Sequence, residues 1–195
     1  MKNTMILPSN YRRLLDIDLQ KDKKLALLVN GLSLLIAVPM VLLAPVSVLS
    51  LLDMSLGIRP AFLRLCVALV GMVAYIFLHE LVHGIFIRHF SGVKAHYGFT
   101  GLYAYAGSDT YFNKKSYLII ALAPVVFWGV VLAVLTQLVP ESWFWSVYFI
   151  QICNISGAAG DLYVTVKFAG LPADILVQDS GVAMSVFAPD GNSGL

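Results

Sequence analysis

The chain has 195 residues, of which 59% are hydrophobic and 12% are charged, and its mean hydropathy is +0.82. A soluble globular domain is about 25% charged, so the composition excludes an ordinary soluble domain and indicates an integral membrane protein. The net charge is +2. The sequence has no Lys/Arg-rich run with interleaved aromatic residues, and we therefore expect no nucleic-acid partner.

Four apolar segments follow a polar leader of residues 1–24. Each has at least the roughly 20 residues that a membrane helix needs, and we place these spans at residues 25–52, 61–87, 117–139 and 143–166. The first is too long for a signal-peptide core and has no evident small-residue cleavage site, so we interpret it as a retained span. The fourth is the least apolar, because "NISGAAGD" interrupts it.

The connection between the second and third spans is rich in Gly and Tyr and alternates roughly between apolar and polar residues. This pattern predicts two short strands broken near Thr100–Gly101. The tail, residues 167–195, contains several Gly and Pro residues, and it predicts an irregular segment with a short strand at Ile175–Val177. We therefore expect one all-α transmembrane domain over residues 1–195, with four membrane helices and a β-hairpin-like connection between helices two and three.

The basic residues are distributed unevenly between the two sides of this topology. With the leader inside, all of the 13 Lys and Arg residues except Arg59 and Arg64 lie on the cytoplasmic side. By the positive-inside rule, both termini are expected in the cytoplasm.

The second span contains "FLHELVHGIF", residues 77–86, which places three ionisable side chains in an apolar helix. Residues four apart lie on one face of a helix, so His79 and His83 can present ring nitrogens to one ion. In HExxH sites two imidazoles bind Zn²⁺, the metal lowers the pKa of its water to about 7, and the glutamate, here Glu80, acts as general base. Ionisable groups are costly in a membrane span, so the pattern predicts a zinc site rather than a structural polar cluster.

A catalytic zinc takes three protein ligands and a water, and Asp161 is the candidate for the third. Spans two and four run in the same direction in the predicted topology. Asp161 is therefore expected at a depth similar to that of His79 and His83, toward the cytoplasmic end. Asp109 and Asp179, in loops, are reserve candidates.

Other residues near the predicted site have more than one interpretation. Asn154 lies two helical turns before Asp161 on roughly the same face, where it could hydrogen-bond substrate or a developing oxyanion, or link helices. The small residues 157–160, "GAAG", would let another helix approach closely. His89 and His96 lie outside the span, and we expect them to be surface or interfacial residues.

"HELVHG" in a span, the Gly/Tyr-rich connection, "ALAP" in the third span and the late "SGAAGD" resemble bacterial membrane proteins of the "putative zincin peptidase" family, over about residues 60–180. The metal-site motifs are more distantly similar to the site-2 protease family of intramembrane metalloproteases. The resemblance implies His79 and His83 as histidine ligands, Glu80 as catalytic glutamate and Asp161 as the aspartate ligand. The sequence departs from the site-2 protease pattern Asn…Pro…Asp-Gly, because a glycine stands where the proline would be and a leucine follows the aspartate.

The sequence thus predicts a membrane-embedded zinc hydrolase, and the family resemblance implies a bacterial plasma membrane. Our preferred interpretation is a peptidase that cleaves a membrane-associated polypeptide near the cytoplasmic face. The expected partners are membrane lipid and the polypeptide substrate. A non-catalytic metal-binding sensor or scaffold is an alternative, although it would not need Glu80. A zinc hydrolase of a non-peptide amide or ester would have the same residues. Bis-histidine haem is excluded, because two histidines one helical turn apart cannot face each other across an iron.

Overall fold

The structure is a computed structural model of the chain, and it describes residues 2–55, 57–101 and 103–191. The chain folds into two compact units, and each is assembled from separate parts of the sequence. Unit 1 contains Met1–Leu28, Glu80–Ala123 and Asp161–Leu195. Unit 2 contains Val29–His79 and Pro124–Gly160.

Three helices are long and apolar enough to cross a membrane: α1 (Lys23–Leu42), α2 (Ile58–Ser91) and α3 (Lys114–Leu138). They match the first three expected spans. The helix of the first span is shorter than expected, because α1 ends at Leu42 and a short 3-10 helix, η1 (Val48–Leu52), follows. Pro45 explains this end, since proline has no backbone N–H and disfavours a helical conformation in the residue before it.

The expected fourth span, residues 143–166, is not one continuous helix. It consists of α4 (Phe144–Gly157) and α5 (Ala159–Ala169), which are interrupted at Ala158 and preceded by a 3-10 helix, η2 (Glu141–Trp143). Gly157 and Gly160 flank the interruption, and glycine is a poor helix former. Neither α4 nor α5 has the length that a membrane helix needs.

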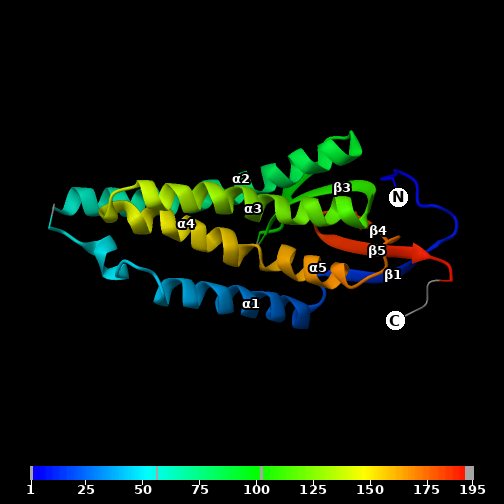
Figure 1. Ribbon diagram of the computed structural model, residues 1–195, viewed down its shortest axis with the longest axis horizontal. Coiled ribbons are helices and arrows are strands. Elements are labelled where there is room, and N and C mark those ends of the chain that lie inside the picture. The colour runs from blue at the N-terminus through cyan, green and yellow to red at the C-terminus, as the bar shows by residue number, and fades with distance from the viewer. Residues whose placement is uncertain (1, 56, 102, 192–195) are drawn as a thin grey trace. The chain divides into compact units, whose positions relative to one another are not determined.

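A five-stranded antiparallel sheet in unit 1 corrects the expectation of an all-α fold. Its strands are β1 (Tyr11–Asp18), β2 (His96–Phe99), β3 (Ala104–Asn113), β4 (Leu176–Asp179) and β5 (Ala183–Pro189), in the order β1-β5-β4-β3-β2. The β2–β3 hairpin and the short tail strand confirm two predictions. We missed β1 because its partner β5 lies at the other end of the sequence. We also missed β5, although the turn at Ser180–Gly181 joins it to β4. Figure 1 shows β5 between β4 and β1.

Apolar side chains from the sheet and from three helices form the core of unit 1. Phe112, Phe168, Val177 and Val186 are almost completely buried there. Ile87, one helical turn after His83, is buried in the same core. Complete burial of such a side chain stabilises the fold by about 1.5–3 kcal/mol, so this core holds the end of α2 that follows the motif.

The high Gly and Tyr content of the β2–β3 region has a packing reason. Tyr97 lies over Gly84 of α2, and Tyr105 lies over Gly98 and Gly181, so closely that a Cβ at any of these glycines would overlap the tyrosine side chain. Gly181 also has a φ of +82°, which favours glycine. A side chain at any of these positions would force the tyrosine that covers it to move.

The leader is part of unit 1 and fixes the point where α2 ends. The Asn3 amide donates to the carbonyl oxygen of Phe90 (2.9 Å) and to Ser116 Oγ (3.2 Å). Asn3 Oδ1 in turn accepts from the backbone N–H of Asn113 at 2.9 Å. These bonds join the leader to the end of α2 and to the start of α3.

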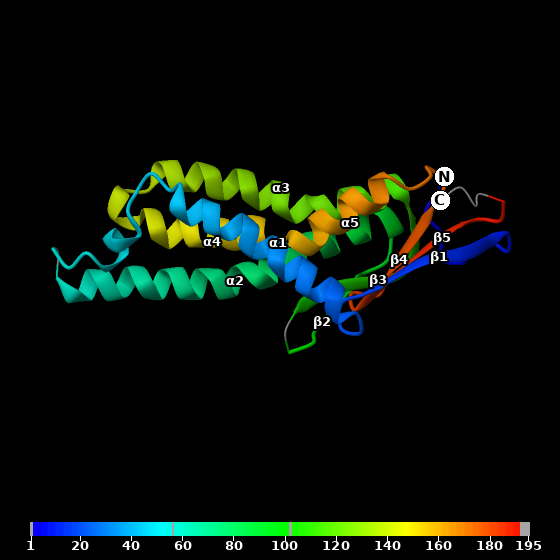
Figure 2. The same ribbon diagram turned by 90° about the horizontal axis from the view of Figure 1, so that it is seen from below.

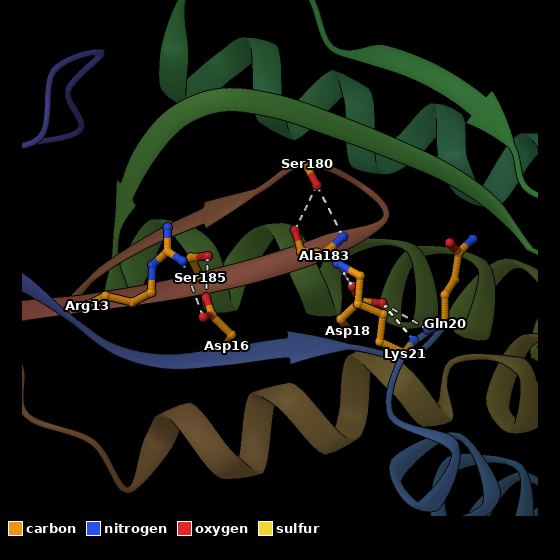
Figure 3. Close-up of polar contacts among 8 residues, drawn as sticks. All are labelled: Arg13, Asp16, Asp18, Gln20, Lys21, Ser180, Ala183 and Ser185. Carbon is orange, nitrogen blue, oxygen red and sulfur yellow. Dashed lines mark hydrogen bonds and ion pairs between the residues drawn. The ribbon is translucent and has the colours of Figure 1, made fainter.

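Polar side chains line the part of β1 and β5 that Figure 3 shows. Ser185 of β5 donates to Asp16 of β1 at 2.6 Å. The Asp18 carboxylate, at the end of β1, accepts from the backbone N–H groups of Gln20 and Lys21 and lies 3.1 Å from Lys21 Nζ. These contacts stabilise the turn between β1 and α1.

Unit 2 is almost free of charge and has its own apolar cluster. Four of the Asp, Glu, Lys and Arg residues in the sequence fall in it, namely Asp53, Arg59, Arg64 and Glu141. Its buried cluster includes Leu51 of η1 with Phe144, Trp145 and Ile152 of α4. Trp145 Nε1 donates to the carbonyl oxygens of residues 46 and 47, so the segment that precedes η1 is bound to α4.

Candidate metal centre

The motif forms a compact group of possible ligands on α2. His79, Glu80 and His83 each offer one side-chain ligand atom, and these atoms lie within 4.8 Å of one another. The helix causes this, since residues three and four apart are neighbours on its surface. His79 is buried, whereas Glu80 and His83 are half-buried.

In unit 1, His83 is held by a backbone carbonyl and faces a carboxylate. Its Nδ1 lies 2.9 Å from the carbonyl oxygen of Ile120 in α3. A carbonyl can only accept a hydrogen bond, so Nδ1 carries the proton, and in the neutral ring Nε2 has the free lone pair. This Nε2 lies 3.6 Å from Oδ1 of Asp161, which is in the first turn of α5.

In unit 2, His79 is held by a tyrosine hydroxyl. Tyr75 Oη lies 2.7 Å from His79 Nδ1 and also donates to Asn154 Oδ1 at 2.7 Å. Tyr75 is one helical turn before His79, and both side chains are buried. The two ligand histidines thus have their Nδ1 atoms in hydrogen bonds, as expected of imidazoles that bind a metal through Nε2.

Asp161 and Asn154, the other two predicted site residues, are not members of the ligand group of His79, Glu80 and His83. Asp161 is beside His83, although the compact group itself does not extend to it within the described residues. Asn154 is fully buried, and its amide donates to the Val125 carbonyl (3.2 Å) and to Gln151 Oε1 (3.4 Å). The bond to Val125 links α4 to α3, as one of its two interpretations predicted, whereas Gln151 is on the same helix as Asn154.

The small-residue patch at 157–160 packs closely at its alanines but not at its glycines. Ala158 and Ala159 are almost completely buried, whereas no described atom outside the neighbouring backbone lies within 4 Å of where a Cβ would be at Gly157 or Gly160. These two glycines therefore mark the interruption between α4 and α5 and leave open space beside it. His89 and His96 are exposed, as expected, and so is Asp109, which lies in β3.

Sequence reasoning gave too little weight to Asp179 and missed Tyr117 and Tyr75. Asp179 ends β4, and its Oδ2 accepts from the Tyr117 hydroxyl at 2.7 Å while its Oδ1 accepts from the N–H of Gly181 at 2.8 Å. It interacts electrostatically with Asp161 and His83. The spacing of Tyr75, four residues before a ligand histidine, was a signal that could have been used. No sequence signal places a tail strand beside this site.

Burial raises the pKa of the Asp179 carboxyl above its usual value of 3.8, and the neighbouring Asp161 carboxylate adds to this rise. The hydrogen bonds from Tyr117 and Gly181 and the nearby His83 oppose it. Asp179 therefore retains its proton to a higher pH than an exposed aspartate does.

The donor set fits a zinc ion. Imidazole nitrogens and carboxylate oxygens are ordinary zinc ligands, with bonds of about 2.0–2.2 Å. In the neutral tautomer fixed by the Ile120 carbonyl, His83 presents an unprotonated nitrogen, and Asp161 supplies a carboxylate next to it. His79, His83 and Asp161 would hold the ion, and Glu80 would remain for proton transfer.

Two histidines four residues apart on a helix, with a glutamate after the first, define a zincin-type metal site. The family described as "Putative zincin peptidase" matches residues 72–176, which include the motif and Asp161. The chain therefore belongs to this family.

The chain is also similar to a curated relative described as an uncharacterized 24.7 kDa protein of Pyrococcus woesei. The two are 29% identical over 118 residues, which are 58% of this chain and 51% of the relative. The chain thus spans about half the length of the curated relative it matches. No solved structure matches the chain.

Proposed function

We propose that this chain is a membrane-embedded zinc metallopeptidase that cleaves a membrane-associated polypeptide near the cytoplasmic face of a bacterial plasma membrane. The observation that carries the proposal is the ligand group of His79, Glu80 and His83 within 4.8 Å, on a helix apolar enough to cross a membrane. Ionisable groups in such a helix are costly and usually mark a functional site. The family to which the chain belongs supports hydrolysis of peptides.

The chain's own residues have separate roles in this reaction. Zinc, when bound, would polarise the scissile carbonyl and make a water a strong nucleophile at neutral pH. Glu80 is the general base that accepts the water's proton, and then the general acid that donates it to the leaving amine. His83 and His79 are held through their Nδ1 atoms, so their rings do not need to reorient during the reaction.

The substrate would bind as an extended strand beside β2. This strand is an edge of the sheet in Figure 2, and backbone pairing at a free edge is a common way of binding peptides. Tyr97 and Phe99 of β2 are 53% and 68% exposed and would contact substrate side chains. A helical substrate must first unwind, because a helix engages its carbonyl groups in hydrogen bonds.

The membrane topology in this proposal has both termini in the cytoplasm and lipid around the apolar helices. Two observations support it. Ten of the 13 Lys and Arg residues lie in the leader and in the connection between the second and third expected spans, and α1 exposes Leu34, Leu35 and Leu42. Oligomeric state is not part of the proposal.

The test begins with zinc content and peptide hydrolysis of protein purified in detergent. Wild type and Glu80→Ala should each hold about one zinc, because both keep the three proposed ligands His79, His83 and Asp161. His79→Ala and Asp161→Ala each lack one of these ligands and should lose the zinc. Glu80→Gln should lower hydrolysis by about 10²–10⁴-fold, the usual contribution of a general base.

The other outcomes identify the alternatives. Wild type without zinc, after purification with zinc supplied, would overturn the hydrolase proposal. Stoichiometric zinc without hydrolysis of any polypeptide, with Glu80→Gln indistinguishable from wild type, would favour a non-catalytic sensor or scaffold. Cleavage of small amide or ester substrates alone would indicate a non-peptide hydrolase.

A further inference from the structure

A chain of hydrogen bonds between neutral side chains ends on His79 in unit 2. It runs from Gln151 through Asn154 and Tyr75 to the Nδ1 atom of the histidine. Asn154 has no exposed surface, and the other three side chains are 6–8% exposed. Buried polar groups cost free energy unless they are hydrogen-bonded, and this chain provides those bonds.

The protons of this chain can be assigned from its two ends. The Asn154 amide donates to the Val125 carbonyl, so its Oδ1 is the atom that faces Tyr75. Tyr75 has one hydroxyl proton, and it donates that proton to Asn154 Oδ1. Tyr75 Oη must then accept from His79, which places the histidine's proton on Nδ1.

We propose that Tyr75 and Asn154 are positioning residues that select the Nδ1-protonated tautomer of His79 and leave its Nε2 lone pair to the metal. The inference rests on the proposed zinc site. It gives Asn154 a role that requires no contact with substrate. Metal-binding histidines commonly donate their second N–H to such a partner, and loss of the partner costs about 10- to 100-fold in metal affinity.

Packing also fixes the tyrosine that carries the hydroxyl. The Tyr75 ring makes edge contacts with Trp128 (centroids 6.4 Å apart) and with His79 (5.7 Å). Trp128 Nε1 donates to the carbonyl oxygen of Leu78, at 3.3 Å. Tyr75 therefore has a defined orientation toward the histidine.

The test measures zinc affinity by chelator competition on the full chain in detergent, together with the absorption spectrum of the Co²⁺-substituted protein. Tyr75→Phe should bind zinc about 10- to 100-fold more weakly than wild type and should alter the Co²⁺ spectrum. Tyr148→Phe is the matched control. It removes another tyrosine hydroxyl of unit 2, one that donates to the Met40 carbonyl at 3.0 Å, and it should leave zinc affinity unchanged.

A second variant tests the proton assignment. In Asn154→Leu the Tyr75 hydroxyl loses its acceptor and can donate to His79 Nδ1 instead, which favours the tautomer that cannot bind metal through Nε2. Zinc affinity should fall although Tyr75 and His79 are intact. Both substitutions act on the same tautomer of His79, so their effects should not add. The double variant Tyr75→Phe/Asn154→Leu should bind zinc about as well as the single variant with the lower zinc affinity.

The outcomes separate this inference from the zinc site itself. If wild type binds zinc and Tyr75→Phe binds it equally well, the hydrogen-bond chain is only structural and the inference is wrong. The inference is also wrong if Tyr148→Phe loses as much affinity as Tyr75→Phe. Wild type that binds no zinc would overturn the zinc site and this inference together.

Discussion

The two histidines of the motif lie one turn apart on the same helix, yet their surroundings are of opposite kinds. In unit 2, His79 contacts neutral side chains, Tyr75 and through it Asn154. In unit 1, His83 lies between a backbone carbonyl and the carboxylate of Asp161, and the carboxyl group of Asp179 interacts with it electrostatically.

The difference follows the charge content of the units. Unit 2 contains four of the charged residues in the sequence, whereas unit 1 contains the sheet and nearly all of the Asp, Glu, Lys and Arg. A neutral hydrogen-bond chain costs less in apolar surroundings than a buried carboxylate does. Each histidine thus has a hydrogen-bond partner that suits the charge content of its own unit.

The largest expected effect is from Asp161→Asn, which removes the charged partner of His83. The change deletes a candidate ligand as well as the carboxylate 3.6 Å from Nε2, so zinc affinity should fall by about 100-fold or more, beyond the usual cost of losing a supporting group. Chelator competition measures it. Asp109→Asn is the control, because Asp109 is an exposed carboxylate on β3. If the two variants bound zinc equally well, the carboxylate of Asp161 would have no special role beside His83.

Gly84→Ala should disturb the contact between α2 and Tyr97 of the β2–β3 hairpin, which lies within unit 1. The added methyl overlaps Tyr97, and overpacking of this kind costs about 1–3 kcal/mol. Gly31→Ala, in α1 with no neighbour within 4 Å, should instead be neutral or stabilise by up to about 1 kcal/mol. Thermal unfolding in detergent measures both.

Removal of the tyrosine side chain tests the cause of that cost. Gly84→Ala/Tyr97→Ala should recover most of the stability that Gly84→Ala loses. No recovery would show that the methyl group clashes with something other than Tyr97.

A smaller effect, on pH dependence, is expected from Asp179→Asn. The folded-state pKa of this carboxyl is raised, so the folded state binds the proton more tightly than the unfolded state. The residue's contribution to stability is therefore greatest below pH 3.8 and is lost as the pH rises from there through the raised pKa. The melting temperature of the variant should thus rise relative to wild type between pH 4 and neutral pH, and a constant difference would contradict the assignment.

The smallest effect is expected from Asp18→Asn, in the turn shown in Figure 3. The hydrogen bonds with the Lys21 side chain and with the backbone N–H groups of Lys21 and Gln20 lower the pKa of Asp18. Because the pKa of Asp18 is lower in the folded state, its carboxylate stabilises the fold above about pH 4, and this stabilisation is lost as the pH falls through the folded-state pKa. The variant should be slightly less stable at pH 7 and equal to wild type at very low pH. A difference that persists in acid would indicate a contact unrelated to this charge.

The sequence was sufficient for features that depend on local patterns. The apolar runs predicted α1, α2 and α3, and the HExxH spacing predicted the ligand group, because helix geometry alone puts His79 and His83 on one face. Alternation and turn residues predicted the β2–β3 hairpin. In the predicted topology the motif and Asp161 lie at a similar depth in the membrane. This suggested Asp161 as a ligand, and it lies beside His83.

What the sequence did not show depends on long-range pairing. β1 pairs with a strand at the other end of the sequence, and Asp179 reaches the surroundings of His83 only because β4 pairs with β3. The spacing of Tyr75 and His79 indicates that they are neighbours on the helix, but it does not show that the Tyr75 hydroxyl lies between His79 and Asn154. The continuous fourth span was a wrong prediction, because we interpreted "NISGAAGD" as a less apolar part of one helix, whereas the helix is interrupted there at Ala158.

The pairing of β1 with β5 has a consequence for how the protein is made. Among the five described strands, β1 leaves the ribosome first and β5 last, and Tyr11 pairs with Pro189. During synthesis β1 therefore has no strand to pair with until the helices and the other strands have been made. The sheet beside His83 is thus completed only when residues 183–189 have emerged, and a nascent chain that stops before them has its motif helix but lacks the strand that joins β1 to β4.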